Sequence, residues 1–481
     1  MTNQVSKPIK IVSFGFFLFP FLLVTGPFLP DLFVVITCIY FIFVNGLKSS
    51  FLKYKKEFIF FLLFFLYLNL NSLLVSEQKF ISAKVSLPYL RYFIFSFLII
   101  YFLFNVENFK KFFFYSCIIC LIVLFLDSIY QFYNKANILG YPIYDSRISS
   151  FFNEELILGS YTSKIIIILL AISFSLDLKD KNKKFIHFFI FFIGYSLILL
   201  SNERTSFACL VIIFSIYCLI ELNLKNFLLT ILFIFILNLI LYTIYPKSFE
   251  RIIFHSIDQI KNSKSLFLSS YRHDLHYFTA LQMFKEKPLF GNGLKSFRYK
   301  CSDPIYKVKE KVLKDKAVYA KDDGYIEIKN HKKIYLITNN KEEVFIGLQF
   351  RNQSSTTLKN FEQIKKGQYL GSFYEFDNGC NTHPHNTHFQ FLAELGLTGY
   401  VFLLVTILYL IKDIYKIIKK KFYDRLKLLN YEKSYIVCLV GLLIQINPLF
   451  PSGSFFNNYN SIIFFMIASF LIYFKYINKA Q

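Results

Sequence analysis

Residues 380–411 read CNTHPHNTHFQFLAELGLTGYVFLLVTILYLI. The apolar part of this stretch, Phe389–Ile411, is long enough to cross a bilayer as a helix. Three histidines, His383, His385 and His388, stand at its start. Because imidazole is the side chain that titrates nearest neutral pH, the sequence places acid–base chemistry at a membrane surface.

Apolar runs of this length recur along the whole chain. The 481 residues are 55% hydrophobic and 20% aromatic, a composition typical of a membrane protein. We therefore predict an all-α polytopic membrane protein with about 12 transmembrane helices. The expected spans are Ile11–Thr25, Leu32–Val44, Phe58–Leu74, Leu90–Phe104, Phe112–Phe132, Leu156–Leu176, Phe185–Leu200, Ser206–Ile220, Phe227–Tyr245, Phe389–Ile411, Tyr435–Phe450 and Asn460–Phe474.

The net charge of +23 does not indicate a nucleic-acid partner, because Lys and Arg fall mostly in the loops between apolar runs. With a cytoplasmic N-terminus, the inward loops hold most of these residues. The short outward loops hold only Lys79, Lys84, Lys135, Arg147 and Arg204. The asymmetry predicts that both termini are cytoplasmic and that residues 246–387 face outward. Arg91 and Lys164 fall in the outer halves of spans and are expected to line a wet cavity with Asp127 and Gln131.

The outward segment divides the chain into three parts: spans one to nine (1–245), a periplasmic loop domain (246–387) and spans ten to twelve (388–481). Polar and apolar residues alternate in Tyr271–Lys285 as in a helix lying along the membrane interface, ended by Pro288 and Gly291-Asn292-Gly293. Period-two alternation then predicts strands near 325–328, 334–337 and 344–348. We expect a small β-rich insert over 301–380.

The eight cysteines fall into two groups. Six lie in expected spans and are treated as small apolar residues. Cys301 and Cys380 bracket the β-rich insert on the outward, oxidising side, so we predict a disulfide between them that ties the insert's ends together beside the histidines.

Basic side chains recur at the outward ends of the spans. Arg147, Arg204 and Arg272 join the histidines on one face of the membrane. Guanidinium binds phosphate oxygens in pairs without losing its proton, so this set predicts an anion site. Each residue taken singly is equally consistent with a solvated loop.

Several motifs resemble those of the O-antigen ligase and polymerase superfamily, membrane enzymes that move glycans from an undecaprenyl-pyrophosphate carrier. The most specific is the histidine motif and its sequel, His383-Pro384-His385-Asn386-x-x-Phe389 and Leu392-Ala393-Glu394-x-Gly396-x-x-Gly399. Others are Ser201-x-Glu203-Arg204-Thr205, Arg147-x-x-x-Phe151, and Arg272 with Ala280, Pro288-Leu289-Phe290-Gly291-x-Gly293 and Phe297. With the expected spans, the resemblance covers nearly the whole chain.

The resemblance implies a metal-independent, inverting glycosyl transfer on the periplasmic face of the bacterial inner membrane. His385 is the expected base and His383 the second choice, because histidine near neutral pKa suits removal of a proton from a sugar hydroxyl. Arg204, Arg272 and Arg147 would bind the departing pyrophosphate, with Glu203, Asn386 and Glu394 in supporting roles. The chain contains no Asp-x-Asp motif, and no cofactor is expected. The expected partners are the lipid-linked glycan donor, a lipid A-core or other glycan acceptor, and membrane lipids.

Alternatives remain open at this point. Polymerases and protein-glycosylating enzymes of the superfamily share these motifs. A transporter for the lipid-linked glycan is the rival from another class, although no internal repeat favours it. His383, His385 and His388 also suit zinc, but no fourth ligand stands nearby in the sequence. Asn386 or Thr387 could simply cap the following helix, and Gly396 and Gly399 could permit close helix contact.

Overall fold

The computed structural model describes most of the helical part of the chain. The described residues are 12–44, 46–144, 147–221, 232, 242–243, 246–254, 256–257, 271–306, 315–320, 325–328, 332–338, 343–346, 357–359, 369–374 and 379–480. The expected span Phe227–Tyr245 lies almost wholly outside them.

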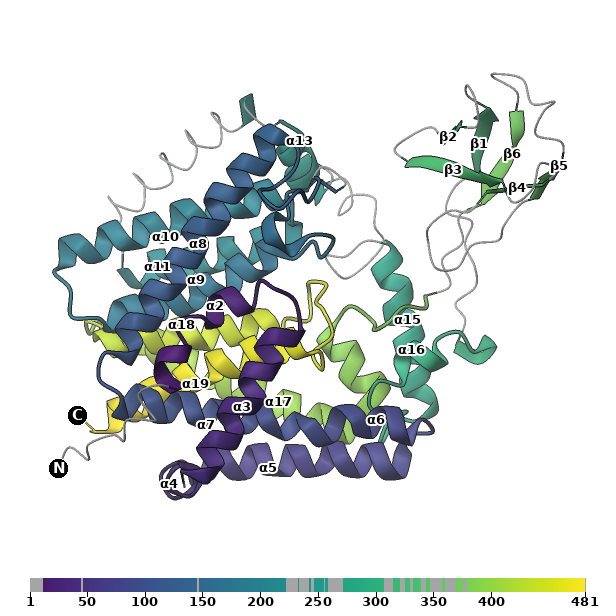
Figure 1. Cartoon of the computed structure of the whole chain (residues 1–481). Helices are drawn as coiled ribbons and strands as arrows, with labels where there is room; N and C mark the ends of the chain where they lie inside the picture. The colour runs from purple at the N-terminus through teal and green to yellow at the C-terminus, as the bar shows by residue number, and fades with distance from the viewer. Residues whose placement is uncertain are drawn as a thin grey trace.

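Eight helices of the described chain are long and apolar enough to cross a membrane, and each coincides with an expected span. They form a bundle of roughly parallel and antiparallel rods (Figure 1). They are α5 (Lys55–Leu70) with η1 (Asn71–Val75); α6 (Lys79–Ser86), η2 (Leu87–Tyr89) and α7 (Leu90–Asn105) as one span; α8 (Phe109–Asn134); α9 (Leu158–Ser175); α10 (Asp180–Ser201); α11 (Arg204–Glu221); α17 (Thr387–Phe422); and α19 (Asn458–Ala480).

Three expected spans differ in the structure. The first is interrupted by turns: residues 12–15 are helical, and α2 then covers only Phe19–Leu22, with Pro20 in its first turn. The second, α3 (Phe28–Phe43), bends by 82° into α4 (Gly46–Lys53). The eleventh, α18 (Asn430–Gln445), has 16 residues, fewer than a straight crossing of the hydrocarbon layer needs.

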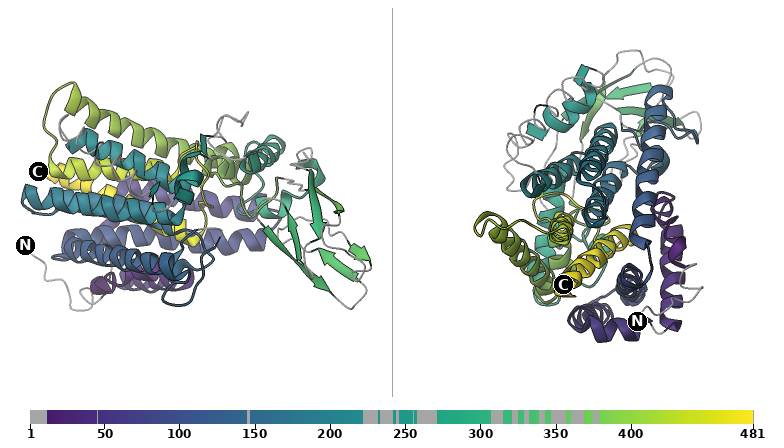
Figure 2. Two further views of the ribbon diagram at one scale, coloured as in Figure 1. Left: turned by 90° about the horizontal axis from the view of Figure 1, so that it is seen from above. Right: turned by 90° about the vertical axis from the view of Figure 1, so that its left-hand side faces the viewer.

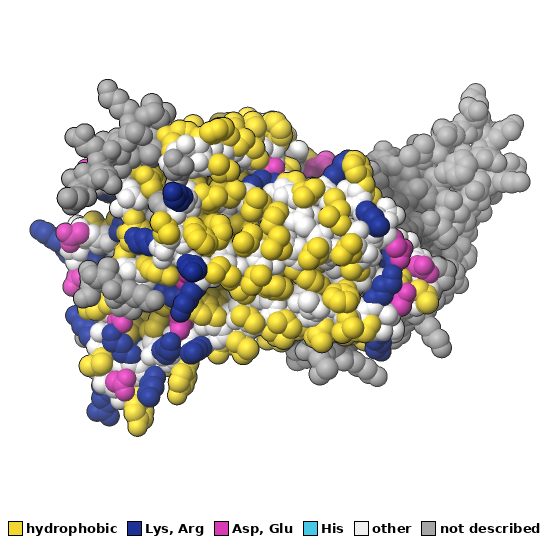
Figure 3. Space-filling view, turned by 90° about the horizontal axis from the view of Figure 1, so that it is seen from below, with side chains coloured by type: hydrophobic (Ala, Val, Ile, Leu, Met, Phe, Trp, Pro, Cys, Tyr) yellow, Lys and Arg dark blue, Asp and Glu magenta, His cyan; other side chains and the backbone are white. Residues whose placement is uncertain are grey.

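Helix α9 forms the centre of the bundle. Its residues Ile165–Ile172 are all buried, because α8, α10, α11 and α18 surround it (Figure 2). A helix that is surrounded by other helices is expected to be apolar on every side. The outer helices instead expose apolar side chains, and one face of the molecule shows a broad hydrophobic band with charged side chains gathered toward its ends (Figure 3). This band suits a lipid environment.

The segment after α11 contains α13 (Pro246–Phe249), η4 (Glu250–Phe254), α15 (Tyr271–Glu286), α16 (Phe297–Lys300) and η5 (Pro304–Tyr306). Helix α15 matches the helix expected over 271–285 and packs against α17. In Figure 1, α15 and α16 lie at the opposite end of the bundle from α4 and the C-terminal end of α19. We call the end that carries α15 the α15 end.

Helix α17 is broken at Gly396, whose backbone has φ 65° and ψ −167°. The loop 288–293 (Pro288-Leu289-Phe290-Gly291-Asn292-Gly293) lies against this break. The amides of Leu397 and Thr398 donate to the carbonyls of Pro288 and Leu289, at 2.8 and 3.1 Å. These amides therefore bond to the loop instead of to the preceding turn of their own helix.

The carbonyls on the other side of the break are satisfied by the same loop. Those of Ala393 and Glu394 accept from the amides of Asn292 and Gly293, at 3.0 and 2.8 Å. A Cβ on Gly396 would lie 2.4 Å from the Gly291 amide nitrogen, which leaves room only for glycine. The two glycine-containing motifs of the sequence are therefore two halves of one interlocked backbone structure.

Among the described residues between Cys301 and Cys380, six strands form one antiparallel sheet in the order β5-β4-β3-β2-β1-β6. Three of them coincide with the stretches expected as strands. The strands are β1 (Asp315–Ala320), β2 (Tyr325–Ile328), β3 (Lys332–Thr338), β4 (Glu343–Ile346), β5 (Thr357–Lys359) and β6 (Tyr369–Tyr374).

Candidate active site

The start of α17 is held by Asn386. Its Oδ1 accepts hydrogen bonds from the amides of His388 and Phe389, at 2.9 and 3.4 Å, and its Nδ2 donates to the carbonyl of Pro448 at 2.8 Å. These contacts satisfy helix amides that have no partner within the helix, so the capping role considered for Asn386 is confirmed. The cap also fixes the loop that carries His383 and His385.

Four imidazoles gather at this loop. The ring of His385 lies 4.1 Å from that of His383, 5.3 Å from that of His273 and 5.4 Å from that of His276, measured between ring centroids. The last two come from α15, three residues apart on one helix face. Sequence reasoning did not include His273 and His276, although both follow closely on Arg272.

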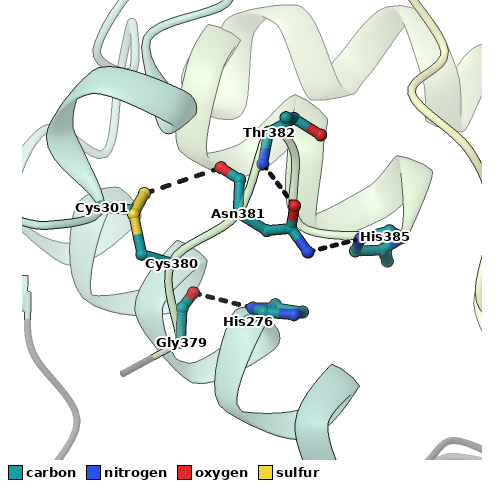
Figure 4. The surroundings of a disulfide bond; sticks show 7 residues. All are labelled: His276, Cys301, Gly379, Cys380, Asn381, Thr382 and His385. Carbon is teal, nitrogen blue, oxygen red and sulfur yellow. Dashed lines mark hydrogen bonds between the residues drawn. A yellow bond between two sulfur atoms is a disulfide. The ribbon is translucent and has the colours of Figure 1, made fainter. Parts of the chain in front are cut away.

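Hydrogen bonds determine which ring nitrogens carry protons (Figure 4). Asn381 Oδ1 accepts from the Thr382 amide at 2.7 Å, which orients the side-chain amide so that Nδ2 faces His385 Nε2 at 3.0 Å. Since Nδ2 can only donate, His385 Nε2 accepts and the neutral ring carries its proton on Nδ1. His276 Nδ1 donates to the carbonyl of Gly379 at 2.9 Å.

Both histidines of the loop are neutral at physiological pH. Burial, followed by the positive charge of Lys295, lowers the pKa of His383 to about 4. Burial, followed by the neighbouring imidazole of His383, lowers the pKa of His385 to about 2. A neutral imidazole can accept a proton, but both pKa values lie well below the near-neutral value that the sequence predicted for the base.

His388 has a different environment. It lies in the first turn of α17, where Nδ1 contacts Tyr400 Oη at 2.9 Å and Nε2 contacts the carbonyl of Ile446 at 2.8 Å. Both nitrogens are thus occupied by protein groups, and the side chain ties α17 to the end of α18. Within the described parts of the chain, no group of three or more His, Cys, Asp or Glu side chains has a metal-binding arrangement.

A disulfide joins Cys301 and Cys380, the pair expected from the sequence. Cys301 follows α16, and Cys380 lies between Gly379 and Asn381, the residues that contact His276 and His385 (Figure 4). The disulfide therefore fastens the segment that orients two of the four imidazoles.

The side chain of Glu203, in the motif Ser201-x-Glu203-Arg204-Thr205, is held by hydrogen bonds. Its two carboxylate oxygens accept from the amides of Gly159 and Ser160, at 2.9 and 3.0 Å, and from Ser206 Oγ at 2.9 Å. These amides are in the first turn of α9, where a carboxylate is favourable. Burial raises the pKa of Glu203, and the nearby Arg147 opposes that rise.

Arg147 is engaged in the same structure. Its Nη2 lies 3.5 Å from Glu203 Oε1 and donates to the carbonyl of Leu156 at 2.7 Å, while Nε donates to the carbonyl of Ser201 at 3.2 Å. Arg204 follows as the first residue of α11. The structure thus brings Arg147 and Glu203 together, beside Arg204 in the chain.

Arg272 occupies the first turn of α15, directly before His273. Its backbone is therefore next to the four imidazoles, while its side chain lies outside the described residues. Glu394 is fully buried in α17, where Oε2 accepts from Gln390 Nε2 at 3.1 Å. Gln390 also bonds to Ser454 Oγ and the Phe455 amide, so this pair links α17 to the segment before α19.

Asp127 and Gln131 also have structural partners. Asp127 Oδ1 accepts from the Ile138 amide at 3.0 Å, and Gln131 Oε1 accepts from the Ser150 amide at 2.8 Å. These two side chains hold the loop after α8. The cavity that the sequence predicted for them, shared with Arg91 and Lys164, stays a prediction.

Fold and site together define a polytopic helical membrane protein with a cluster of four histidines at one end of its bundle. A family model described as O-antigen ligase matches residues 187–327. This match supports the O-antigen ligase superfamily, the family that the sequence motifs resemble. The matched region contains Arg204, Arg272 and the loop 288–293, and it ends before His383. No curated protein matches the chain.

Proposed function

We propose that this protein is an O-antigen ligase that transfers a glycan from undecaprenyl pyrophosphate to lipid A-core. The observation that carries the proposal is the cluster of four imidazoles at the start of α17, in a chain with a superfamily match over residues 187–327. An acceptor hydroxyl would lose its proton to an imidazole as it attacks the anomeric carbon, with inversion. The lipid pyrophosphate would depart, and no metal enters this mechanism.

His385 is the proposed base, and its Nε2 must be released from a hydrogen bond before it can act. Its Nε2 lone pair already accepts from Asn381, so this amide must give way when the acceptor hydroxyl binds. His383 is the alternative: its Nε2 is buried and has no hydrogen-bond partner among the described residues. Negative charge from the donor would raise the pKa of either imidazole and strengthen it as a base.

Arg204 and Arg272 are the proposed ligands of the departing pyrophosphate, since fixed cations stabilise charge that develops on a leaving group. The contacts of Arg147 with Glu203 and two carbonyls favour a role in holding the 201–206 segment in place. Glu203, Asn386 and Glu394 would act as supporting residues through the contacts described above.

The proposed location is the bacterial inner membrane, with the α15 end in the periplasm and both termini in the cytoplasm. The excess of Lys and Arg in the loops at the other end supports this orientation. The Cys301–Cys380 disulfide supports it as well, because disulfides persist in oxidising compartments. Residues 246–387 with the sheet would then form the periplasmic loop domain.

Reconstitution with an undecaprenyl-pyrophosphate-linked glycan and lipid A-core tests the proposal. We expect a product with the mass of glycosylated lipid A-core, in the presence of excess chelator. Chain extension of the donor would instead identify a polymerase, and a glycosylated protein would identify a protein O-oligosaccharyltransferase. Movement of donor across the bilayer without any product would favour a transporter.

Single variants separate the two candidate bases. We expect His385→Ala to lower transfer by a factor on the order of 10²–10⁴ with unchanged membrane abundance. The matched variant His383→Ala should retain more activity. Near-normal transfer by His385→Ala together with loss in His383→Ala would reassign the base to His383.

A further inference from the structure

The span made of α5 and η1 provides a scale of depth for the α15 end. No charged residue lies between Glu57, near its start, and Glu77, just after its end. With a rise of about 1.5 Å per residue, the stretch between these carboxylates is about 30 Å long, the thickness of the hydrocarbon layer. Charged side chains seldom face that layer. Glu77 therefore marks the expected boundary of the hydrocarbon at the α15 end.

The loop 288–293 begins at this boundary and descends below it. Lys287 Nζ forms an ion pair with Glu77 Oε1 at 3.0 Å, so α15 ends near the level of that carboxylate. The carbonyl of Phe290 then accepts from Asn71 Nδ2 at 2.7 Å. Asn71 lies about 9 Å deeper in the span than Glu77 at the helical rise. Three extended residues cover about 10 Å, so the chain from Lys287 to Phe290 is long enough for this descent.

The chain then returns to the same boundary. A Cβ on Gly293 would lie 2.4 Å from Ser76 Cβ, so the backbone of Gly293 packs against the residue next to Glu77. Farther along, Lys300 also forms an ion pair with Glu77. Both ends of the loop thus lie at the level of Glu77, and its deepest contact is that of Phe290.

Protein groups satisfy the backbone at this depth. The carbonyls of Pro288 and Leu289 accept from two amides of α17, and that of Phe290 accepts from Asn71. Backbone outside a helix is tolerated at membrane depth where such partners are present. The contact also explains a polar residue inside a span, because Asn71 is buried and bonds to the loop.

The side chains at the tip of the loop continue the hydrophobic band of the outer helices. Leu289 and Phe290 are 59% and 51% exposed. The charged run Lys285-Glu286-Lys287 stops immediately before Pro288. The two helices that bond to the loop also expose apolar side chains close to these contacts in the chain, namely Leu70, Leu73 and Leu74 of α5 and η1, and Leu397 and Val401 of α17.

We propose that loop 288–293 is re-entrant: it dips into the membrane leaflet at the α15 end, and Leu289 and Phe290 contact the acyl chains of lipids there. The loop domain between α11 and α17 is then anchored in the bilayer at a second place besides its two ends. The anchor holds the break in α17 at a fixed depth. It is independent of the proposed glycosyl transfer and needs no action of His385.

Tryptophan fluorescence tests the proposal, because the chain contains no native tryptophan. Phe290→Trp places one at the tip of the loop in the full-length protein, reconstituted in phosphatidylcholine vesicles. We expect phosphatidylcholine brominated on its acyl chains to quench this emission as strongly as that of Leu66→Trp, an exposed position in the middle of α5. The matched control Ile305→Trp replaces an exposed apolar residue of η5. Its emission should be quenched by iodide present on both sides of the membrane, and little by the brominated lipid.

The opposite pattern at position 290 would overturn the proposal. Iodide would then quench Phe290→Trp as it quenches Ile305→Trp, and brominated lipid would have little effect. Leu289→Trp is a second probe at the tip that gives the same readout if the Phe290 variant does not fold. Circular dichroism and thermal midpoints establish which variants are folded. Glycan transfer is not part of this readout, so its loss or retention bears only on the proposed function.

Discussion

At the scale of single residues, hydrogen bonds distinguish the environments of His383, His385 and His388. His388 is occupied at both nitrogens, while His383 and His385 stand beside two imidazoles of α15. The sequence motif alone does not distinguish these histidines as candidates for the base. Their contacts distinguish His388, which joins two helices, from His383 and His385, which suit proton transfer.

Asn381 is the residue that controls the proton on His385. In the unmodified protein we expect kcat/KM for glycan transfer to stay level from pH 8 down to about 5, because a histidine with a pKa near 2 is already neutral there. Asn381→Asp places a negative charge against Nε2, which favours the protonated ring and raises the pKa of His385. The acid limb of the profile should therefore move to higher pH, with a lower maximum.

Asn381→Gln is the control, since it keeps an amide that can donate. An unshifted profile in Asn381→Asp would show that the base is not the imidazole that Asn381 contacts. Loss of activity at every pH without a shift would point to a structural role for this residue.

At the scale of elements, the broken helix α17 explains why two separate glycine motifs occur. Each supplies the hydrogen-bond partners that the other lacks, and the backbones approach closely enough to exclude a Cβ at Gly396 or Gly291. The contact joins α17, which begins at the histidines, to the end of α15, which carries two more of them.

Gly396→Ala tests this contact. The conformation at φ 65° and ψ −167° is essentially restricted to glycine, so alanine costs roughly 1–3 kcal/mol of strain before the clash with Gly291 is counted. We expect a lower thermal midpoint and reduced glycan transfer. The control Leu397→Ala alters an exposed side chain in the same turn and should leave the midpoint nearly unchanged. A normal midpoint in Gly396→Ala would mean that the loop and α17 separate readily.

The disulfide constrains a second segment at the histidines, residues 379–381. Reduction, or the pair Cys301→Ser/Cys380→Ser, releases the segment that orients His276 and His385. Because small displacements of the proposed base are costly, we expect transfer to fall on the order of tenfold or more while the helical bundle stays folded. Reductant should lower the activity of the unmodified protein and leave that of the double variant unchanged. Equal sensitivity of both would assign the effect to another group.

At the scale of the whole molecule, the bundle has two ends of different character. The α15 end holds the imidazoles, the disulfide and a cavity lined by Lys84, Lys295 and Arg298. The opposite end holds ion pairs of lysines with acidic residues, such as Lys420–Glu432 and Lys475–Glu57. The charge asymmetry of the loops predicts which end faces the cytoplasm.

Labelling with a membrane-impermeant maleimide tests this orientation. Lys135→Cys lies after α8 toward the α15 end, and Lys427→Cys lies between α17 and α18. We expect position 135 to react in intact spheroplasts and position 427 to react only after permeabilisation. The six free cysteines are buried and should contribute little background. The reverse pattern would place the histidines in the cytoplasm.

The amino-acid sequence by itself determined most of the apolar helices, a cap at Asn386 or Thr387, the helix over 271–285 and the pairing of Cys301 with Cys380. These features depend on local hydropathy, on turn and cap residues, and on two cysteines that share one compartment. Only the tertiary structure decided that His273 and His276 join His385, that loop 288–293 fills the break in α17, that Glu203 holds the first turn of α9, and that Lys84 and Arg298 share a cavity. Those partners lie far apart in the chain, and which of them meet is set by helix packing, because local periodicity says which face of a helix is buried and not what it is buried against.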